Sequence, residues 1–299
     1  MGIFSGLEAL GLGKLKNTDI YVEDEQKKQE EKPVVQAKKT EKHQITEEEC
    51  IFDKKVKCPV CDEEFKTKMV KTGRAKLIGQ DTDLRPKYQE VDSLKYDAVL
   101  CPHCGYAALN RFFNYMTSTQ AKWIREQISS SFQGADQTEK PIYTYDEAIM
   151  RHKLALLSTV VKKAKASERA YVCLKLAWLS RGKAETLPEN TPDLAHIKEV
   201  LHKEEMEDLK SAYEGFATAF SKENFPICGM DELTVSYLLA DLARQLGKYD
   251  EAKKYISRVL TSRESNERIK SKARTLKDRI TEDEMAAKQA ASMKGAKES

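Results

Sequence analysis

The sequence lacks long apolar runs and any strong excess of one charge. No stretch approaches the roughly 18 apolar residues that a membrane-spanning helix requires. The amino terminus, MGIFSGLEALGLGKLKN, has neither a basic region ahead of an apolar core nor a small-residue cleavage site, so it does not indicate a secretory signal. Lys and Arg number 51 against 48 Asp and Glu, which leaves a net charge of +3 and no global electrostatic case for nucleic acid or membrane. We therefore expect a cytoplasmic protein.

Sequence motifs of common enzyme active sites are also missing. The run GLGKLK is not a phosphate loop, because Glu8 stands where that motif requires glycine and Leu15 where it requires serine or threonine. The chain has no nucleophile elbow and no His-rich metal centre. A non-enzymatic protein is the favoured expectation, and a metal-dependent or thiol enzyme stays an alternative.

The length and composition predict two folded units with tails. A chain of 299 residues is too long for one simple core, and 33% charged residues fit helices with wide polar faces. The predicted parts are a flexible amino-terminal segment over 1–49, a zinc-ribbon-like domain with following helices over 50–130, a tetratricopeptide-like helical domain over 141–290 and a disordered tail over 291–299.

The amino-terminal segment combines a short apolar peptide with a charged tether. Residues 23–49 mix both charges with almost no large apolar side chain, so they cannot bury enough surface to offset their ordering entropy. Spaced apolar residues at a tethered chain end suit binding in a groove. A frayed terminus is the plain alternative. The apolar residues concerned are Ile3, Phe4, Leu7, Leu10, Leu12 and Leu15.

Four of the seven cysteines occur in two closely spaced pairs. Cys58 and Cys61 lie in CPVCDEEF, while Cys101 and Cys104 lie in CPHCGYAAL. In a reducing compartment this spacing favours metal binding over a disulfide framework. Two residues between thiolates let one turn aim both sulfurs at one ion, and two such turns complete a tetrahedron. We predict one structural Zn²⁺ per chain, bound by these four side chains.

Other chemistry for the cysteine pairs is less well supported by the sequence. An iron–sulfur cluster also takes four cysteines and stays an alternative. A thioredoxin-type site needs only one CxxC, at the start of a helix within alternating strands and helices. A catalytic zinc needs an open fourth position, and four cysteines leave none. Gly105 supplies the left-handed conformation that ends such a turn, and Asp62 tolerates the same conformation in the first turn. His103 is expected to be a spacer and no ligand.

The region between and after the cysteine pairs is predicted to change from strands to helices. FKTKMVK and YDAVL favour strands. A helix is expected near Leu109, and another after Thr117 or Ser118, where a capping residue precedes STQAKWIREQI. Everything beyond the break at 129–141 is predicted to be helical, with a last helix over 265 to about 290. Cys173 and His152 are expected to be core residues of their helices.

The helical half contains an internal repeat. YDEA opens a segment at Tyr145 and again at Tyr249, and VSYLLADLARQLGK precedes the second copy with apolar residues at helical spacing. The resulting hairpin, 234–262, resembles a tetratricopeptide repeat. The residues that match its packing positions are Ala240, Gly247, Tyr249 and Ala252. Irregular pairs of this kind predict a short curved solenoid.

Two polar runs in the small domain have a plain and a functional interpretation. DTDLRPKY contains Asp81, Asp83, Arg85 and Tyr88, and carboxylates beside an arginine could bind a cation or assist acid–base chemistry. Asp and Pro are also ordinary turn residues, which is the interpretation we favour. KTKMVKTGRAK, residues 66–76, is basic without an acidic residue but lacks the aromatic residues that stack on nucleic acid.

These features together resemble a known bacterial family. KKVKCPVCDEEFKTKMVKTG, the Asp-Thr-Asp turn followed by a tyrosine, and YDAVLCPHCGYAAL are similar to the family called domain of unknown function 2225, found mostly in Firmicutes. The resemblance covers about residues 50 to 290 and implies a cytosolic protein with two CxxC turns and helical repeats, whose biochemical role is unassigned. Asp62 departs from the glycine frequent at that position, which leaves the metal prediction in place.

The predicted fold class is α+β, with a small zinc-ribbon-like β domain followed by an all-α tetratricopeptide-like domain. The function we expect is a zinc-binding interaction or scaffold protein that binds a protein or peptide on its helical surface. A zinc ribbon that binds nucleic acid through residues 66–76 and the last helix is the alternative. The sequence specifies neither the partner nor the oligomeric state.

Overall fold

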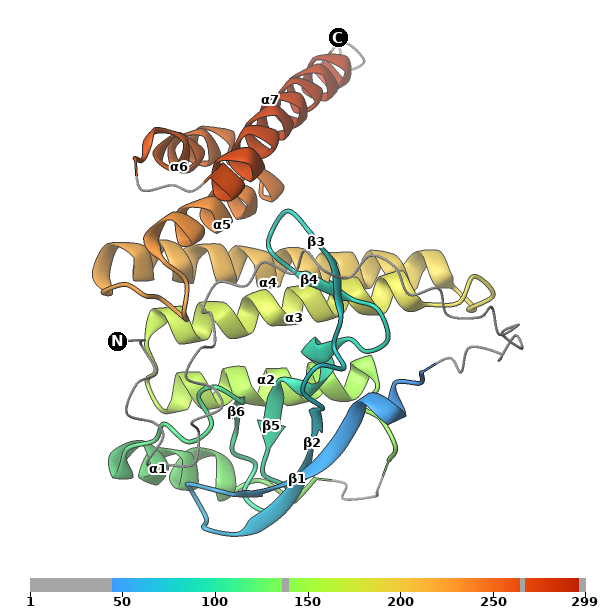
Figure 1. Cartoon of the computed structure of the whole chain (residues 1–299), viewed down its shortest axis with the longest axis vertical. Coiled ribbons are helices and arrows are strands. Elements are labelled where there is room, and N and C mark those ends of the chain that lie inside the picture. The colour runs from blue at the N-terminus through green and yellow to red at the C-terminus, as the bar shows by residue number, and fades with distance from the viewer. Residues whose placement is uncertain (1–44, 136–139, 264–266, 296–299) are drawn as a thin grey trace, which may run out of the picture. The chain divides into compact units, whose positions relative to one another are not determined.

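The computed structural model describes residues 45–135, 140–263 and 267–295 (Figure 1). Within them, small antiparallel hairpins come first and helices α1 to α7 make up most of the rest, a mixed α+β fold with a mostly helical carboxyl-terminal part. The predicted fold class is therefore confirmed. The apolar peptide and nearly all of the charged tether lie outside the described residues.

The described β structure consists of three two-stranded antiparallel hairpins. They pair β1 (Ile51–Lys57) with β2 (Glu64–Val70), β3 (Leu77–Gln80) with β4 (Pro86–Tyr88), and β5 (Ala98–Leu100) with β6 (Ala107–Leu109). The strands predicted from FKTKMVK and YDAVL are confirmed as parts of β2 and β5. Each cysteine pair lies in the turn of one hairpin, the first between β1 and β2 and the second between β5 and β6.

The prediction of a helix near Leu109 is wrong, because Leu109 ends strand β6 and pairs with Ala98. Every residue of β5 and β6 is buried, and the hairpin packs against α2 (Tyr145–Val161). A short apolar run is compatible with helix or strand, and packing decides between them. The next predicted helix is confirmed as α1 (Ser118–Ile124), where the hydroxyl of Thr117 accepts a hydrogen bond from the amide of Gln120 at 3.2 Å.

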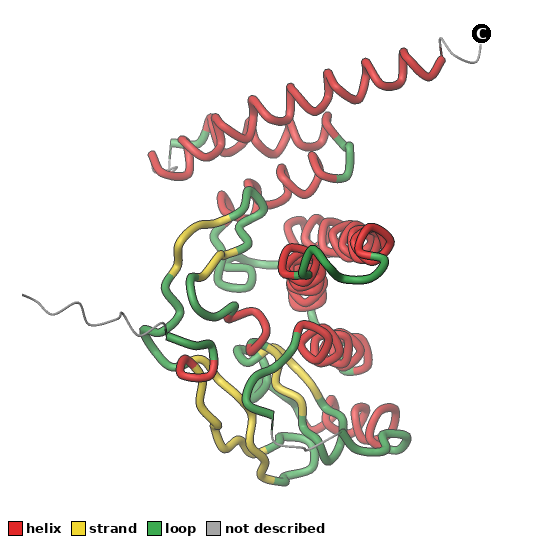
Figure 2. Tube along the Cα trace, turned by 90° about the vertical axis from the view of Figure 1, so that its right-hand side faces the viewer, coloured by secondary structure: helices red, strands yellow, loops and turns green. Residues whose placement is uncertain are grey.

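The helices stack beside the hairpins (Figure 2). A π-helical turn, Arg125–Ser129, extends α1. The other helices are α3 (Ala166–Thr186), α4 (Leu194–Lys222), α5 (Glu232–Gln245), α6 (Tyr249–Thr261) and α7 (Glu267–Gly295). Both copies of YDEA begin a helix as predicted, α2 at Tyr145 and α6 at Tyr249. Among the helices described, none is both long enough and apolar enough to cross a bilayer.

Helix α3 lies at the centre of the described helical stack. It packs against α2 on one side and α4 on the other, and most of its side chains are buried. The main apolar core runs from β5 and β6 through these helices to α7. A second, smaller cluster surrounds the cysteine pairs. Cys173, on α3, is buried in the main core as predicted.

Candidate metal centre

Both cysteine pairs are held in turns with the same backbone pattern. In each turn the amide of the first cysteine donates to the carbonyl five residues later, and the amide four residues later donates to that cysteine's carbonyl. The residue after the second cysteine has a positive φ in both turns, 64° at Asp62 and 75° at Gly105. Both predictions of left-handed conformation are confirmed. The two turns are thus equivalent in backbone geometry, and each points its two sulfurs to the same side.

The four sulfurs form one compact group. The Sγ atoms of Cys58 and Cys104 lie 3.6 Å apart, as do those of Cys61 and Cys101. All four ligand atoms lie within 4.8 Å of one another. Zinc–sulfur bonds of about 2.3 Å in a tetrahedron give sulfur–sulfur edges of about 3.8 Å. The spacing therefore fits a single tetrahedral ion.

Burial and mutual hydrogen bonding make these thiols a set that favours a cation. Cys61 is partly exposed, while the other three cysteines are buried. Contacts with Cys101 and Cys104, together with burial, raise the pKa of Cys58, and hydrogen bonds with Cys104 and Cys58 lower the pKa of Cys101. The hydrogen bond with Cys101 also raises the pKa of Cys104, so the four thiols share their protons unevenly. A bound cation would stabilise all four thiolates together.

The surroundings of the cysteines hold the turns in place. The amide of Val60 donates to Cys58 Sγ at 3.4 Å, and Arg125 Nη1 donates to the carbonyl of Val60 at 2.7 Å. A Cβ atom on Gly105 would lie 2.7 Å from the ring of Phe132, so the second turn requires glycine for space as well as for its φ angle. Within the described residues, the only group suited to a metal consists of these four cysteines, and His103 is outside it.

The polar turn between the cysteine pairs forms an ion-pair network. Arg85 makes a two-pronged contact with Glu185 of α3, at 3.0 and 2.8 Å. Arg181 of α3 contacts Asp83 at 2.7 Å and Glu205 of α4 at 2.7 Å. Asp83 is fully buried, and Arg181 provides the cation that pairs with it. The favoured interpretation as a turn fits, and the turn also anchors the β3–β4 hairpin to the helices.

Sequence reasoning did not identify the partners of this turn. Arg181 and Glu185 lie about a hundred residues after the turn, and no local pattern connects them. With these carboxylates engaged by arginines, the turn has no free set of oxygens for a cation. Tyr88 lies at the end of β4 and lines an adjacent cavity.

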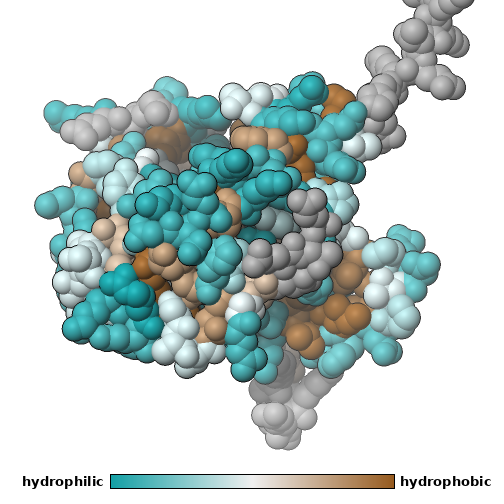
Figure 3. Space-filling model, turned by 90° about the horizontal axis from the view of Figure 1, so that it is seen from below, coloured by the Kyte–Doolittle hydropathy of each residue, from teal (hydrophilic) through white to brown (hydrophobic). Residues whose placement is uncertain are grey.

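One lysine of the basic run 66–76, and Lys57 on the paired strand β1, each pair with a carboxylate. Lys68 on β2 pairs with Asp53 on β1 at 3.0 Å, and Lys57 pairs with Asp62 across the turn at 3.2 Å. Figure 3 views this end of the molecule, where hydrophilic side chains cover much of the surface and apolar ones are interspersed. These pairs reduce the local positive charge and weaken the case for nucleic acid.

His152 is a core residue of α2, as predicted. Its side chain is fully buried, and Nδ1 lies 2.7 Å from the carbonyl oxygen of Ala148. Burial lowers its pKa from 6.5 to about 4, since a charged imidazole would lose its solvation. The folded protein therefore keeps this side chain neutral at a pH where an unfolded chain protonates it.

This histidine should make the protein less stable in mild acid. As the pH falls from about 6.5 to about 4, the unfolded chain binds a proton that the folded protein refuses, so the free energy of unfolding should fall by about 3 kcal/mol. His152→Gln should remove most of this decrease in denaturant titrations at several pH values. His196→Gln, at an exposed position on α4, is the control. Equal pH dependence in both variants would contradict the assignment.

Among the comparisons with known proteins, the scan against family models assigns the chain to a family. A family model described as an uncharacterized protein conserved in bacteria, DUF2225, matches residues 51–280. The match covers well over half of the chain, both cysteine pairs and most of the helices. The search of curated proteins and the search of solved structures each gave no match.

Proposed function

Because the chain belongs to the bacterial family of domain of unknown function 2225, whose description names no activity, we propose from its structure that it is a non-enzymatic interaction protein. A zinc-bound β unit is fixed to a helical stack, and the stack binds a protein or peptide. Support comes from two features, the closed cysteine group and the exposed part of α7. The cysteine group supports the zinc-bound β unit, and the exposed part of α7 supports the binding of a partner.

Zinc is the ion that we propose for the cysteine group. Four thiolates around one tetrahedral ion are a common donor set of structural zinc. In a cluster of several irons the cysteines bind different metal atoms, which requires wider sulfur spacing than the 4.8 Å within which all four ligand atoms lie here. Four protein ligands leave no open position for a substrate. The ion would join hairpins β1–β2 and β5–β6 and have no catalytic role.

The second half of α7 carries the proposal of partner binding. The first half packs on α5 and α6 through Ala273, Leu276 and Ile280, all of them buried. Asp283 and Glu284 still pair with Arg244 of α5 and Lys253 of α6. The carboxyl-terminal end of the helix then extends away from its neighbours (Figure 1), and Met285 and Met293 are 59% and 71% exposed. Exposed methionines adapt readily to different binding surfaces. In stacked-helix proteins an end helix either caps the stack or contacts a further element.

Photo-crosslinking in the native bacterium tests this proposal. A photoreactive residue at position 285 or 293 should give one discrete protein adduct, while the same residue at exposed Lys277, in the packed half of α7, should not. Met285→Lys combined with Met293→Lys should reduce the adduct from a third α7 position, Ala290, at least tenfold through loss of apolar contact.

Three outcomes would contradict the proposal. They are equal adducts at 277 and 285, adducts with nucleic acid instead of protein, and no adduct at any position. The second outcome would support the nucleic-acid alternative, and salt-dependent retention on nucleic acid would then be expected as well.

A further inference from the structure

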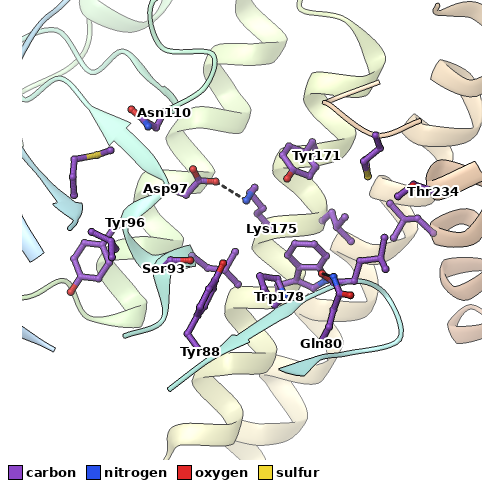
Figure 4. A pocket seen from close by; sticks show the side chains of 18 residues that line it. Gln80, Tyr88, Ser93, Tyr96, Asp97, Asn110, Tyr171, Lys175, Trp178 and Thr234 are labelled. Atoms are coloured by element: carbon purple, nitrogen blue, oxygen red, sulfur yellow. Dashed lines mark hydrogen bonds and ion pairs between the residues drawn. The ribbon is translucent and has the colours of Figure 1, made fainter. Parts of the chain in front are cut away.

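A cavity lies between the β3–β4 hairpin and helices α3 and α5 (Figure 4). Its volume is about 540 Å³, and small-molecule sites typically occupy about 300–1,000 Å³. The segments that line it lie far apart in the sequence, from Met69 on β2 to Leu238 on α5. The cysteine group contributes no residue to the lining. The cavity is therefore separate from the candidate metal centre.

The walls of the cavity are mainly aromatic and aliphatic. Tyr88 enters from β4, and Tyr171 and Trp178 enter from α3 (Figure 4). Leu174 and Leu238 add buried aliphatic surface. Aromatic rings pair favourably with other rings in stacked or edge-on arrangements. The walls thus suit a flat aromatic molecule.

A buried ion pair lies at one side of the cavity. Lys175 Nζ lies 2.6 Å from Asp97 Oδ2, and the lysine side chain is 9% exposed. Burial acts to lower the pKa of Lys175, but the charge of Asp97, its hydrogen bond to the ammonium and the nearby Tyr171 together raise it, so the ammonium stays charged. An ammonium has three hydrogens. Asp97 is the one oxygen partner found for Lys175 among the described residues.

Trp178 presents a second hydrogen-bond donor without an acceptor. Its Nε1 is buried and has no hydrogen-bond partner within the part of the chain that the structure describes. The whole residue is only 4% exposed. Buried donors are nearly always paired in native proteins, so an unpaired one requires an explanation. An acceptor atom supplied from the cavity would engage the spare hydrogens of Lys175, and a small rotation of the indole would bring Trp178 Nε1 to the same atom.

We propose that this cavity binds an uncharged, planar heteroaromatic molecule with a carbonyl-type acceptor beside an N–H donor, as in a nucleobase. The acceptor faces Trp178 and Lys175, the N–H faces Asp97, and the ring packs on the aromatic walls. An uncharged ligand is favoured because Asp97 and Lys175 neutralise each other. An anion would be repelled by Asp97, and a cation by Lys175. This site is independent of the partner surface on α7.

NMR of the indole N–H groups tests the site directly. The chain has two tryptophans, Trp123 and Trp178, and Trp123→Phe assigns the two indole signals. Titration with uracil, hypoxanthine or thymine should move the Trp178 signal saturably, with half-saturation at or below about 1 mM. The Trp123 signal should stay in place. Benzoate and tryptamine, the anionic and cationic comparison compounds, should bind at least tenfold more weakly.

Variants of the polar groups complete the test. Lys175→Met combined with Asp97→Asn removes both charges without leaving one buried alone, and should weaken binding of the base at least tenfold. Trp178→Phe keeps a ring but removes the donor, and calorimetry should show a similar loss. Lys183→Met is the control, since Lys183 lies on the same helix but pairs with Asp146 at 2.5 Å outside this cavity.

The proposal fails if none of the three bases moves the Trp178 signal at about 1 mM. It also fails if benzoate or tryptamine binds as well as the best base. Unchanged affinity in the Trp178→Phe variant would contradict it too, and this variant decides the matter if the double variant does not fold. If Lys183→Met weakened binding as much as the double variant, the loss would come from a general disturbance of α3. That result would also contradict the proposed site.

Discussion

Replacing Cys101 with serine is expected to abolish metal binding and to unfold the part of the protein built on β1–β2 and β5–β6. The proposed zinc ion has four sulfur ligands, and a folded structural site stores its binding energy as folding energy. In zinc-finger peptides this energy is roughly 10–16 kcal/mol, against a net stability of roughly 5–15 kcal/mol for a whole protein. Loss of one ligand should therefore remove most of the stability of this region.

Elemental analysis and denaturant unfolding measure this effect together. The unmodified protein, purified without a tag, should contain about one zinc per chain, and the Cys101→Ser variant should contain almost none. Cys228→Ser is the matched control, because the thiol of Cys228 donates to the carbonyl of Ser167 at 3.3 Å and a hydroxyl can do the same. A metal-free, fully folded unmodified protein would refute the site. Stoichiometric iron would refute zinc as the ion.

Replacing Arg181 with methionine is expected to destabilise the protein by about 3–5 kcal/mol, the usual cost of removing one partner from a buried ion pair. Asp83 is completely buried and lies 2.7 Å from the guanidinium, so the substitution leaves its charge uncompensated. Glu205 loses its contact at the same time. Guanidinium titration followed by circular dichroism gives the change in the free energy of unfolding.

Two further variants test this explanation. Arg258→Met removes the partner of Glu232 in an exposed ion pair, for which about 0–1 kcal/mol is expected. Asp83→Asn introduced together with Arg181→Met should recover part of the lost stability, since an amide is cheaper to bury than a lone carboxylate. A loss for Arg181→Met no larger than that for Arg258→Met would mean that the β3–β4 hairpin is anchored by other contacts.

The parts of the structure that follow from short stretches of sequence were predictable. The left-handed residues Asp62 and Gly105 follow from the cysteine spacing, because a CxxC turn that aims both sulfurs at one ion commonly ends in that conformation. The capped start of α1 after Thr117 is encoded within four residues. The starts of α2 and α6 are likewise encoded within the four residues YDEA. The likeness of α5 and α6 to a tetratricopeptide repeat stays a prediction.

The parts that depend on distant contacts were not predictable. Leu109 is in a strand because β6 pairs with β5 and both pack on α2, and an alanine-rich run carries no such information. Arg181 and Asp83 are 98 residues apart, and their pairing follows only from the folded arrangement. The same holds for Asp97 and Lys175, whose ion pair joins the start of β5 to α3.

Helix α3 contributes side chains both to the cavity and to the ion pairs that anchor the β3–β4 hairpin. Its helical periodicity therefore fixes the position of one set relative to the other. Tyr171, Lys175 and Trp178 occur at intervals of four and three residues, and Arg181 and Glu185 continue the same side of the helix. Each helical residue turns the chain by about 100°. One inserted residue between Trp178 and Arg181 would therefore rotate the ion-pair partners away from the hairpin while the cavity residues kept their place. Length changes are thus more easily accommodated in the 187–193 connection than inside this helix.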